Sequence, residues 1–373
     1  MRRVLLLVGA VACVAGAPAR LAAVQGDQAA RSLQERLARV GADVLSGTDH
    51  MAEAIAELKA ILAIDPRLAD AHLLLGVAYR SVGSPDLTGE ATAELLQALA
   101  LDPRSIPARY YLARLYIDVG RPKRAREELE TALAQMPGQP QFLALLGEAE
   151  RQLGNPARSL ELNRQVLQGD ESFAEARYYL GLAMYDLGRR DEAIQEFERV
   201  VRSGVQKPEV LLSLGAAYVQ AGRLEAAIET LDTATTLAPS RADIRIELAR
   251  AYRSKRLLAK AEEQLTLAEP NAAPALASTA DQQIESDFYQ ELGLVKLQAH
   301  QLAAAAKAFR KVLDIDPNHG PANRALAEVY LLQGLYARAL ECAIRAEKAG
   351  FPLPDEKRKL IAERAGAKGK GRE

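Results

Sequence analysis

The sequence predicts an all-α protein in which about nine antiparallel helix pairs stack end to end as a solenoid. Three observations lead to this prediction: a small residue that returns at a regular interval, a second apolar pattern that follows it at a fixed distance, and prolines that close many of the copies. Of the 373 residues, 49% are hydrophobic and 26% are charged, which is typical of a folded chain.

The first pattern is Leu, then a small residue, then a large residue three positions after the small one. Leu75-Gly76-Val77-Ala78-Tyr79 shows it in full. Spacings of i, i+1 and i+4 place these residues on one face of a helix. The small residues stand at positions 76, 113, 147, 181, 215, 249, 293 and 327, and five of the seven intervals between them are 34 residues long.

The second pattern begins with an Ala twelve residues after the small residue, as at Ala193, and continues with bulky Phe197 and then Val200. We expect this second helix to pack on the first, with Ala193 meeting the small Gly181 at their closest approach. Glycines just past the first helix, such as Gly222, predict left-handed C-caps. Prolines then end one helix, and the next helix begins after them.

These two patterns resemble the tetratricopeptide repeat, a 34-residue pair of helices. The resemblance covers about residues 35–352 and implies a right-handed superhelix. The predicted organisation is a series of segments: repeats 1–7 in 35–275, an insertion in 276–285, repeats 8–9 in 286–352, a C-terminal capping helix in 353–366 and a flexible tail in 367–373.

Two irregularities stand out in this organisation. The insertion is either a tolerated surface loop or a hinge between a seven-repeat and a two-repeat block. After it, Thr279 followed by Gln282 predicts a capping box and a longer first helix for the eighth repeat. The fourth repeat departs most from the pattern, with Ser159 and Asn163 at anchor positions, and we expect the weakest inter-repeat interface there.

The N-terminal residues have the pattern of an export signal. A short basic start, Met1-Arg2-Arg3, precedes an apolar run that ends near Pro18, which is too short for a comfortable transmembrane helix. Residues 1–19 are therefore predicted to be a cleaved signal peptide, and the protein periplasmic or extracellular. Two alternatives are an outer-membrane lipoprotein whose signal ends before Cys13, and an uncleaved anchor.

The composition argues against several function classes. Lys and Arg number 48 against 49 Asp and Glu, so the chain lacks the basic excess of a nucleic-acid binder. We find no phosphate-binding loop, zinc-protease motif or nucleophile elbow, and the repeats leave no room for a catalytic domain. We therefore expect no enzymatic activity, no catalytic residues, no cofactor and no metal site.

Binding is the remaining function. In the family that the chain resembles, the first helices line a concave groove, and here the groove positions are largely apolar with Tyr and Arg among them. In the later repeats they are Tyr178/Leu182/Tyr185, Leu212/Ala216/Val219 and Ile246/Arg250/Arg253. The candidate partner-binding residues are Arg80, Tyr110, Arg114, Tyr178, Tyr185, Arg250 and Arg253, because Tyr and Arg often dominate interface energy. Self-burial of the inner face is an equally good explanation for the apolar residues.

Two functions fit these expectations. The first is an exported scaffold that holds a peptide or helix of another protein in its groove, within a bacterial envelope assembly. The second is a regulatory or accessory subunit that docks on an enzyme. In both cases the partner is another protein, with no nucleic acid and no membrane contact beyond a lipid anchor at Cys13; the oligomeric state is left open.

Overall fold

The computed structural model describes residues 25–47, 50–269 and 279–369 of the chain. These residues form 19 α-helices and one short 3-10 helix, η1 (Pro85–Leu87), and they contain no β-strand. The predicted signal segment 1–19, including Cys13, lies outside the described residues, as do residues 276–278 of the insertion and residues 370–373 of the tail.

The chain divides into two compact units, and the boundary falls within α10, between Tyr179 and Leu180. The helices up to this boundary are α2 (Gln25–Ser46), α3 (Met51–Ile64), α4 (Ala69–Val82), α5 (Thr88–Leu101), α6 (Ile106–Asp118), α7 (Pro122–Gln135), α8 (Pro140–Gln152), α9 (Pro156–Gly169) and α10 (Ala174–Asp186). The helices after it are α11 (Arg190–Arg202), α12 (Pro208–Gln220), α13 (Leu224–Leu237), α14 (Ala242–Ser254), α15 (Leu258–Ala268), α16 (Thr279–Gln298), α17 (Leu302–Ile315), α18 (Gly320–Leu332), α19 (Tyr336–Lys348) and α20 (Asp355–Gly369).

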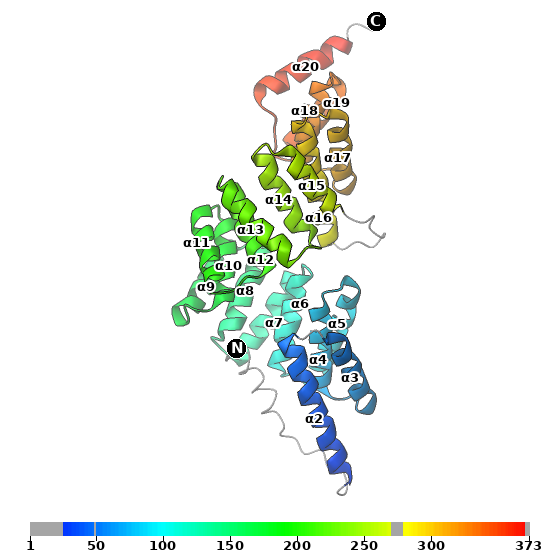
Figure 1. The fold of residues 1–373 in the computed structure, drawn as a ribbon, viewed down its shortest axis with the longest axis vertical. Helices are drawn as coiled ribbons and strands as arrows, with labels where there is room; N and C mark the ends of the chain where they lie inside the picture. The colour runs from blue at the N-terminus through cyan, green and yellow to red at the C-terminus, as the bar shows by residue number, and fades with distance from the viewer. Residues whose placement is uncertain (1–24, 48–49, 270–278, 370–373) are drawn as a thin grey trace. The chain divides into compact units, whose positions relative to one another are not determined.

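Consecutive helices pack as antiparallel pairs, which confirms the predicted fold class. The pairs α4–α5 and α18–α19 show this arrangement clearly in Figure 1. Within each unit, the first helix of a pair also contacts the first helix of the next pair: α4 contacts α6 and α6 contacts α8, while α12 contacts α14 and α14 contacts α16. The first helices therefore form a layer of their own, against which the second helices pack.

Where the small residue of a first helix is glycine, it makes room for a side chain of the paired second helix. A Cβ atom added to Gly215 would lie 2.5 Å from Cγ of Leu231, and one added to Gly181 would lie 2.6 Å from Cε1 of Phe197. We call the space beside the small residue the notch. In these two repeats it is filled by the bulky residue of the same repeat. At Gly181 the three heavy atoms nearest to the added Cβ belong to the ring of Phe197, whereas at Gly76 the carbonyl oxygen of Ala91, which corresponds to Ala193, lies 3.1 Å from the added Cβ.

The fourth repeat has polar residues at this contact. Asn163 takes the place of the bulky residue, and its Nδ2 atom would lie 2.4 Å from a Cβ added to Gly147. Asn163 and Ser159 are fully buried, and Asn163 donates a hydrogen bond of 2.9 Å to the carbonyl oxygen of Ser159. The Oδ1 atom of Asn163 is buried with no partner. The boundary between the two compact units follows this repeat.

The eighth repeat packs directly on the seventh. Its first helix, α16, begins at Thr279, where the sequence predicted a helix start, and it contacts both α14 and α15. At the C-terminal end, α20 packs on α19 and buries Ile361 together with Leu353 of the preceding segment. Leu360, which was expected on the same side as Ile361, is 40% exposed.

Two non-glycine residues occupy the left-handed position that ends the first helix. Gly83, Gly188, Gly222 and Gly334 have φ angles between 70° and 74° there. In the seventh and eighth repeats the corresponding residues are Arg256, with φ of 63°, and His300, with φ of 58°. A residue with a Cβ is strained by about 1 kcal/mol or more in this conformation.

We expect His300→Gly to stabilise the protein by up to about 1 kcal/mol, because glycine adopts a positive φ without that strain. Urea denaturation followed by circular dichroism measures the change. Ala299→Gly is the control, since Ala299 does not have a positive φ and the same loss of a side chain should there be neutral or destabilising. Stabilisation by both variants, or by neither, would contradict the assignment of strain to His300.

Candidate functional site

A cavity of about 190 Å³ opens on the layer of first helices between α10 and α16. It is lined by Leu182 and Tyr185 of α10, Phe197 of α11, Leu212, Ser213 and Ala216 of α12, Asp243, Ile246 and Glu247 of α14, and Ile284 and Asp287 of α16. Five of these residues stand at positions that the sequence assigned to the groove: Leu182, Tyr185, Leu212, Ala216 and Ile246. We call this cavity the first-helix pocket.

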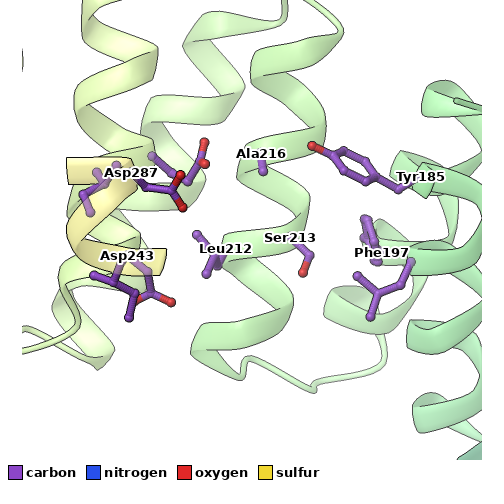
Figure 2. A pocket seen from close by; sticks show the side chains of 11 residues that line it. Tyr185, Phe197, Leu212, Ser213, Ala216, Asp243 and Asp287 are labelled. Carbon is purple, nitrogen blue, oxygen red and sulfur yellow. The ribbon is translucent and has the colours of Figure 1, made fainter. Parts of the chain in front are cut away.

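The first-helix pocket has an apolar side and an acidic side. In Figure 2, Tyr185 and Phe197 lie on one side, the three α12 residues lie in the middle, and Asp243 and Asp287 lie on the other side. The charged residues that line the pocket are Asp243, Glu247 and Asp287, and all of them are acidic. The carboxylates are therefore confined to the side of the pocket formed by α14 and α16.

Glu247 has the most unusual environment among these carboxylates. Its Oε1 atom accepts a hydrogen bond of 2.5 Å from Nη1 of Arg250, whereas its Oε2 atom is buried without a partner. Burial raises the pKa of Glu247; the charge of Arg250 opposes this rise, and the nearby carboxylates of Glu291 and Asp287 add to it. An additional positive charge at Oε2 would therefore stabilise the ionised carboxylate.

The predicted binding residues Arg250 and Arg253 are engaged within the protein. Both contact Glu291 of α16, which is 1% exposed: Nε of Arg250 lies 3.5 Å from Oε2 of Glu291, and Nε of Arg253 donates a short hydrogen bond to Oε1. These contacts link the first helices of the seventh and eighth repeats. The two arginines therefore hold consecutive repeats together.

Tyr185 is half-buried, and its ring lines the pocket. Its hydroxyl accepts a hydrogen bond from Nε2 of Gln220 on α12, and in Figure 2 the hydroxyl points toward α12. Burial raises the pKa of Tyr185, and the charge of Glu247 raises it further, so the hydroxyl stays protonated at neutral pH. Tyr185 thus offers an apolar ring and a neutral polar group to a ligand.

In the other compact unit, the predicted residues Arg80, Tyr110 and Arg114 also have partners. Nε of Arg80 lies 2.7 Å from Oδ2 of Asp118. Arg114 donates a hydrogen bond of 2.9 Å to the Tyr110 hydroxyl and forms an ion pair of 2.8 Å with Glu175. Burial raises the pKa of Tyr110 to about 12, and with 7% exposure Tyr110 presents little surface to a partner.

Tyr178, the last predicted residue, is half-buried and lies beside Tyr179, with ring centroids 5.7 Å apart. The structure thus places the seven candidates in separate groups. Tyr185 and Arg250 belong to the surroundings of the first-helix pocket, and Tyr110 and Arg114 form a second cluster with Glu175.

Sequence reasoning missed the acidic partners Asp118, Glu175, Glu247 and Glu291. Arg80 and Arg253 both stand four residues after the small residue of their repeat, and each pairs with a carboxylate on the first helix of the following repeat. An arginine at that position, with acidic residues on the next first helix, is the sequence signal that could have revealed these pairs.

Within the described parts of the chain, no three His, Cys, Asp or Glu side chains come together in a way that could hold a metal ion. Among the described helices, none combines the length and the apolar character needed to cross a bilayer.

Comparison with solved structures shows the same fold elsewhere. A chain in the crystal structure of the APC/C hetero-tetramer Cut9-Hcn1 is similar with a TM-score of 0.69 and 16% identity, over 88% of this chain and 62% of that chain. A tetratricopeptide repeat protein from Parabacteroides merdae is similar with a TM-score of 0.50 and 17% identity, over 70% of this chain and 99% of that one. At these identities the likeness concerns the fold alone. No match is found among curated proteins.

Comparison with family models identifies the repeats directly. Models described as tetratricopeptide repeat match four segments, which together make up about half of the chain: residues 88–149, 175–203, 208–251 and 296–350. These segments fall on the helix pairs that the 34-residue period predicted, on both sides of the boundary in α10 and on both sides of the insertion. With its stacked helix pairs and its recurring small-residue notches, this chain belongs to the tetratricopeptide repeat family.

Proposed function

We propose that this protein is a non-enzymatic scaffold that binds a peptide or helical segment of another protein on the first helices of its second compact unit. Tetratricopeptide repeat proteins generally mediate protein–protein interactions and are typically non-catalytic. The observation that supports a site here is the first-helix pocket, which opens at five positions that the repeat pattern assigned to the binding groove. A cavity on that layer supplies a concave, largely apolar surface of the kind that binds a ligand side chain.

The cell envelope of a bacterium is the compartment that we propose for this interaction. The proposal rests on the sequence of residues 1–19, where a basic start and a short apolar run have the pattern of an export signal. Fractionation of cells that express the tagged protein tests this point: recovery in the periplasmic or membrane fraction supports export, and full-length protein in the cytosol would contradict it.

Blocking the pocket tests the proposed scaffold function. We expect Ala216→Arg to abolish recovery of the partner, because Ala216 lines the pocket and a long charged side chain there would fill it. The measurement is affinity purification from envelope fractions followed by quantitative mass spectrometry. Thr266→Arg, at an exposed position on α15 of the following repeat, is the control and should leave partner recovery unchanged.

The set of proteins lost with Ala216→Arg decides between the possible functions. Stoichiometric proteins that are lost with Ala216→Arg and kept with Thr266→Arg would support the first-helix pocket as the binding site. An enzyme among them would favour the accessory-subunit role, and structural envelope proteins would favour the scaffold. Equal recovery with both variants would contradict the proposed site.

A further inference from the structure

Building on the proposed function, we infer that the first-helix pocket recognises a partner segment in which a large apolar residue stands next to a Lys or Arg. The apolar residue enters the cavity between the partly exposed Leu182, Leu212 and Ile284, and the basic side chain reaches the acidic side formed by Asp243, Glu247 and Asp287.

The size of the cavity fits one large side chain. An engineered protein cavity of about 150 Å³ takes up a benzene molecule, so a cavity of this size can hold an aromatic or branched aliphatic group. The first-helix pocket measures about 190 Å³, and six of its eleven lining residues are aliphatic or Phe: Leu182, Phe197, Leu212, Ala216, Ile246 and Ile284. An apolar anchor from the partner would therefore replace water against hydrocarbon, which favours binding.

The charge of the pocket determines which residue should stand next to the apolar anchor in the bound segment. No basic residue lines the pocket, and its three carboxylates come from two helices, α14 and α16. Arg250 and Arg241 neutralise Glu247 and Asp243 in part, since Nη1 of Arg250 and Nε of Arg241 contact them. Asp287 accepts a hydrogen bond of 3.1 Å from Gln283 and forms no ion pair with any described residue. Negative charge therefore remains at this edge.

The Oε2 atom of Glu247 is an independent indication of a missing donor. Buried polar atoms are almost always hydrogen-bonded, and an unpartnered buried carboxylate oxygen destabilises the state that contains it. The Oε2 atom of Glu247 is buried without a partner in a residue that lines the pocket. An ammonium or guanidinium group of a bound segment would supply that donor, whereas an acidic segment would be repelled.

Fluorescence anisotropy with labelled synthetic decapeptides and the full chain tests this inference. Three peptides carry Leu followed by Lys, by Gln or by Glu at their centre, and a fourth carries Ser followed by Lys. We expect the Leu-Lys peptide to bind about tenfold more tightly than the Leu-Gln peptide, because a charge-assisted hydrogen bond contributes about that much. The Leu-Glu and Ser-Lys peptides should bind more weakly than Leu-Lys.

A matched pair of variants assigns the preference to Glu247. Glu247→Gln should reduce the preference for Leu-Lys over Leu-Gln to less than about threefold, because it removes the carboxylate charge but keeps the shape of the side chain. Glu263→Gln, at an exposed position on α15 of the same repeat, should leave the tenfold preference unchanged. An equal effect of the two variants would contradict the role of Glu247.

The remaining outcomes separate this inference from the proposed function. Equal binding of Leu-Lys and Leu-Glu peptides, both lost with Ala216→Arg, would overturn the basic preference and leave the scaffold proposal standing. Absence of Leu-Lys binding at millimolar peptide would also overturn it.

Deletion of residues 367–373, which contain Lys368, Lys370 and Arg372, examines the chain's own tail. Unchanged affinity would support a partner segment as the occupant, and a clear increase would assign the pocket to the tail instead.

Discussion

Glu291→Ala should destabilise the second compact unit by about 3 kcal/mol, because it removes the shared carboxylate of two arginines. Glu291 is 1% exposed, and its two oxygens contact Arg250 and Arg253 of the preceding repeat. Breaking a buried ion pair leaves an uncompensated charge, which costs about 3–5 kcal/mol. The side chains of Arg250 and Arg253 are 34% and 17% exposed, so water can hydrate them in part and the loss falls at the lower end of that range.

Urea denaturation measures the total loss, and hydrogen exchange of the α14 and α16 amides shows where it occurs. Glu262→Ala is the matched control, since Glu262 also links the seventh and eighth repeats, through Lys296, but its side chain is 44% exposed. Because water reaches the Glu262 carboxylate, we expect Glu262→Ala to cost less than Glu291→Ala, although its partner Lys296 is only 16% exposed. A loss for Glu291→Ala no larger than that for Glu262→Ala would show that the arginines do not depend on Glu291.

The same contacts explain why α16 packs on α14 although the regular spacing is interrupted between them. The sequence left open whether the insertion is a surface loop or a hinge. Glu291 lies just before the small residue Gly293, and its contacts reach back to α14, so the two helices are connected by charge as well as by apolar packing. A hinge at the insertion would have to break these contacts, which is the event that Glu291→Ala makes easier.

The helix pairs and their internal packing could be predicted because the relevant spacing is short. Gly215 and Leu231 stand sixteen residues apart in one repeat, and the same spacing recurs at Gly293 and Phe309. A pattern confined to one helix pair determines such a contact almost alone. The pattern did not predict which second-helix residue comes nearest to the glycine: at Gly181 it is the ring of Phe197, and at Gly76 the backbone of Ala91 lies within 3.1 Å as well.

The ion pairs and the acidic side of the pocket could not be predicted in this way. Arg114 and Glu175 are 61 residues apart, so their contact depends on how successive repeats stack. Asp287 belongs to α16, which begins after the insertion. Because the 34-residue period is interrupted there, it does not predict how α16 is placed in the layer of first helices. The repeat pattern therefore singled out positions such as Tyr185 and Ala216, which line the first-helix pocket, but it contained no indication of the charge at the edge of the pocket.

Phe309→Ala should destabilise the eighth repeat by about 3–5 kcal/mol, because a fully buried aromatic side chain is removed and a cavity remains. Phe309 is 0% exposed and lies against Gly293: a Cβ added to that glycine would be 2.5 Å from Cε1 of the ring. Urea denaturation of the full chain, with hydrogen exchange of α16 and α17, measures the loss. An unchanged unfolding transition would contradict the central role of this contact.

The reciprocal substitution tests whether Phe309 is the reason that position 293 requires a glycine. Gly293→Ala alone should destabilise by about 1–3 kcal/mol through overpacking, although alanine is the better helix former by about 1 kcal/mol. With Phe309→Ala in place the added methyl group meets empty space, so Gly293→Ala should become neutral or stabilising. The two substitutions should therefore be coupled by at least about 1 kcal/mol. Additive effects would mean that Gly293 is required for another reason, and the small residue that defines the repeat would then need a different physical explanation.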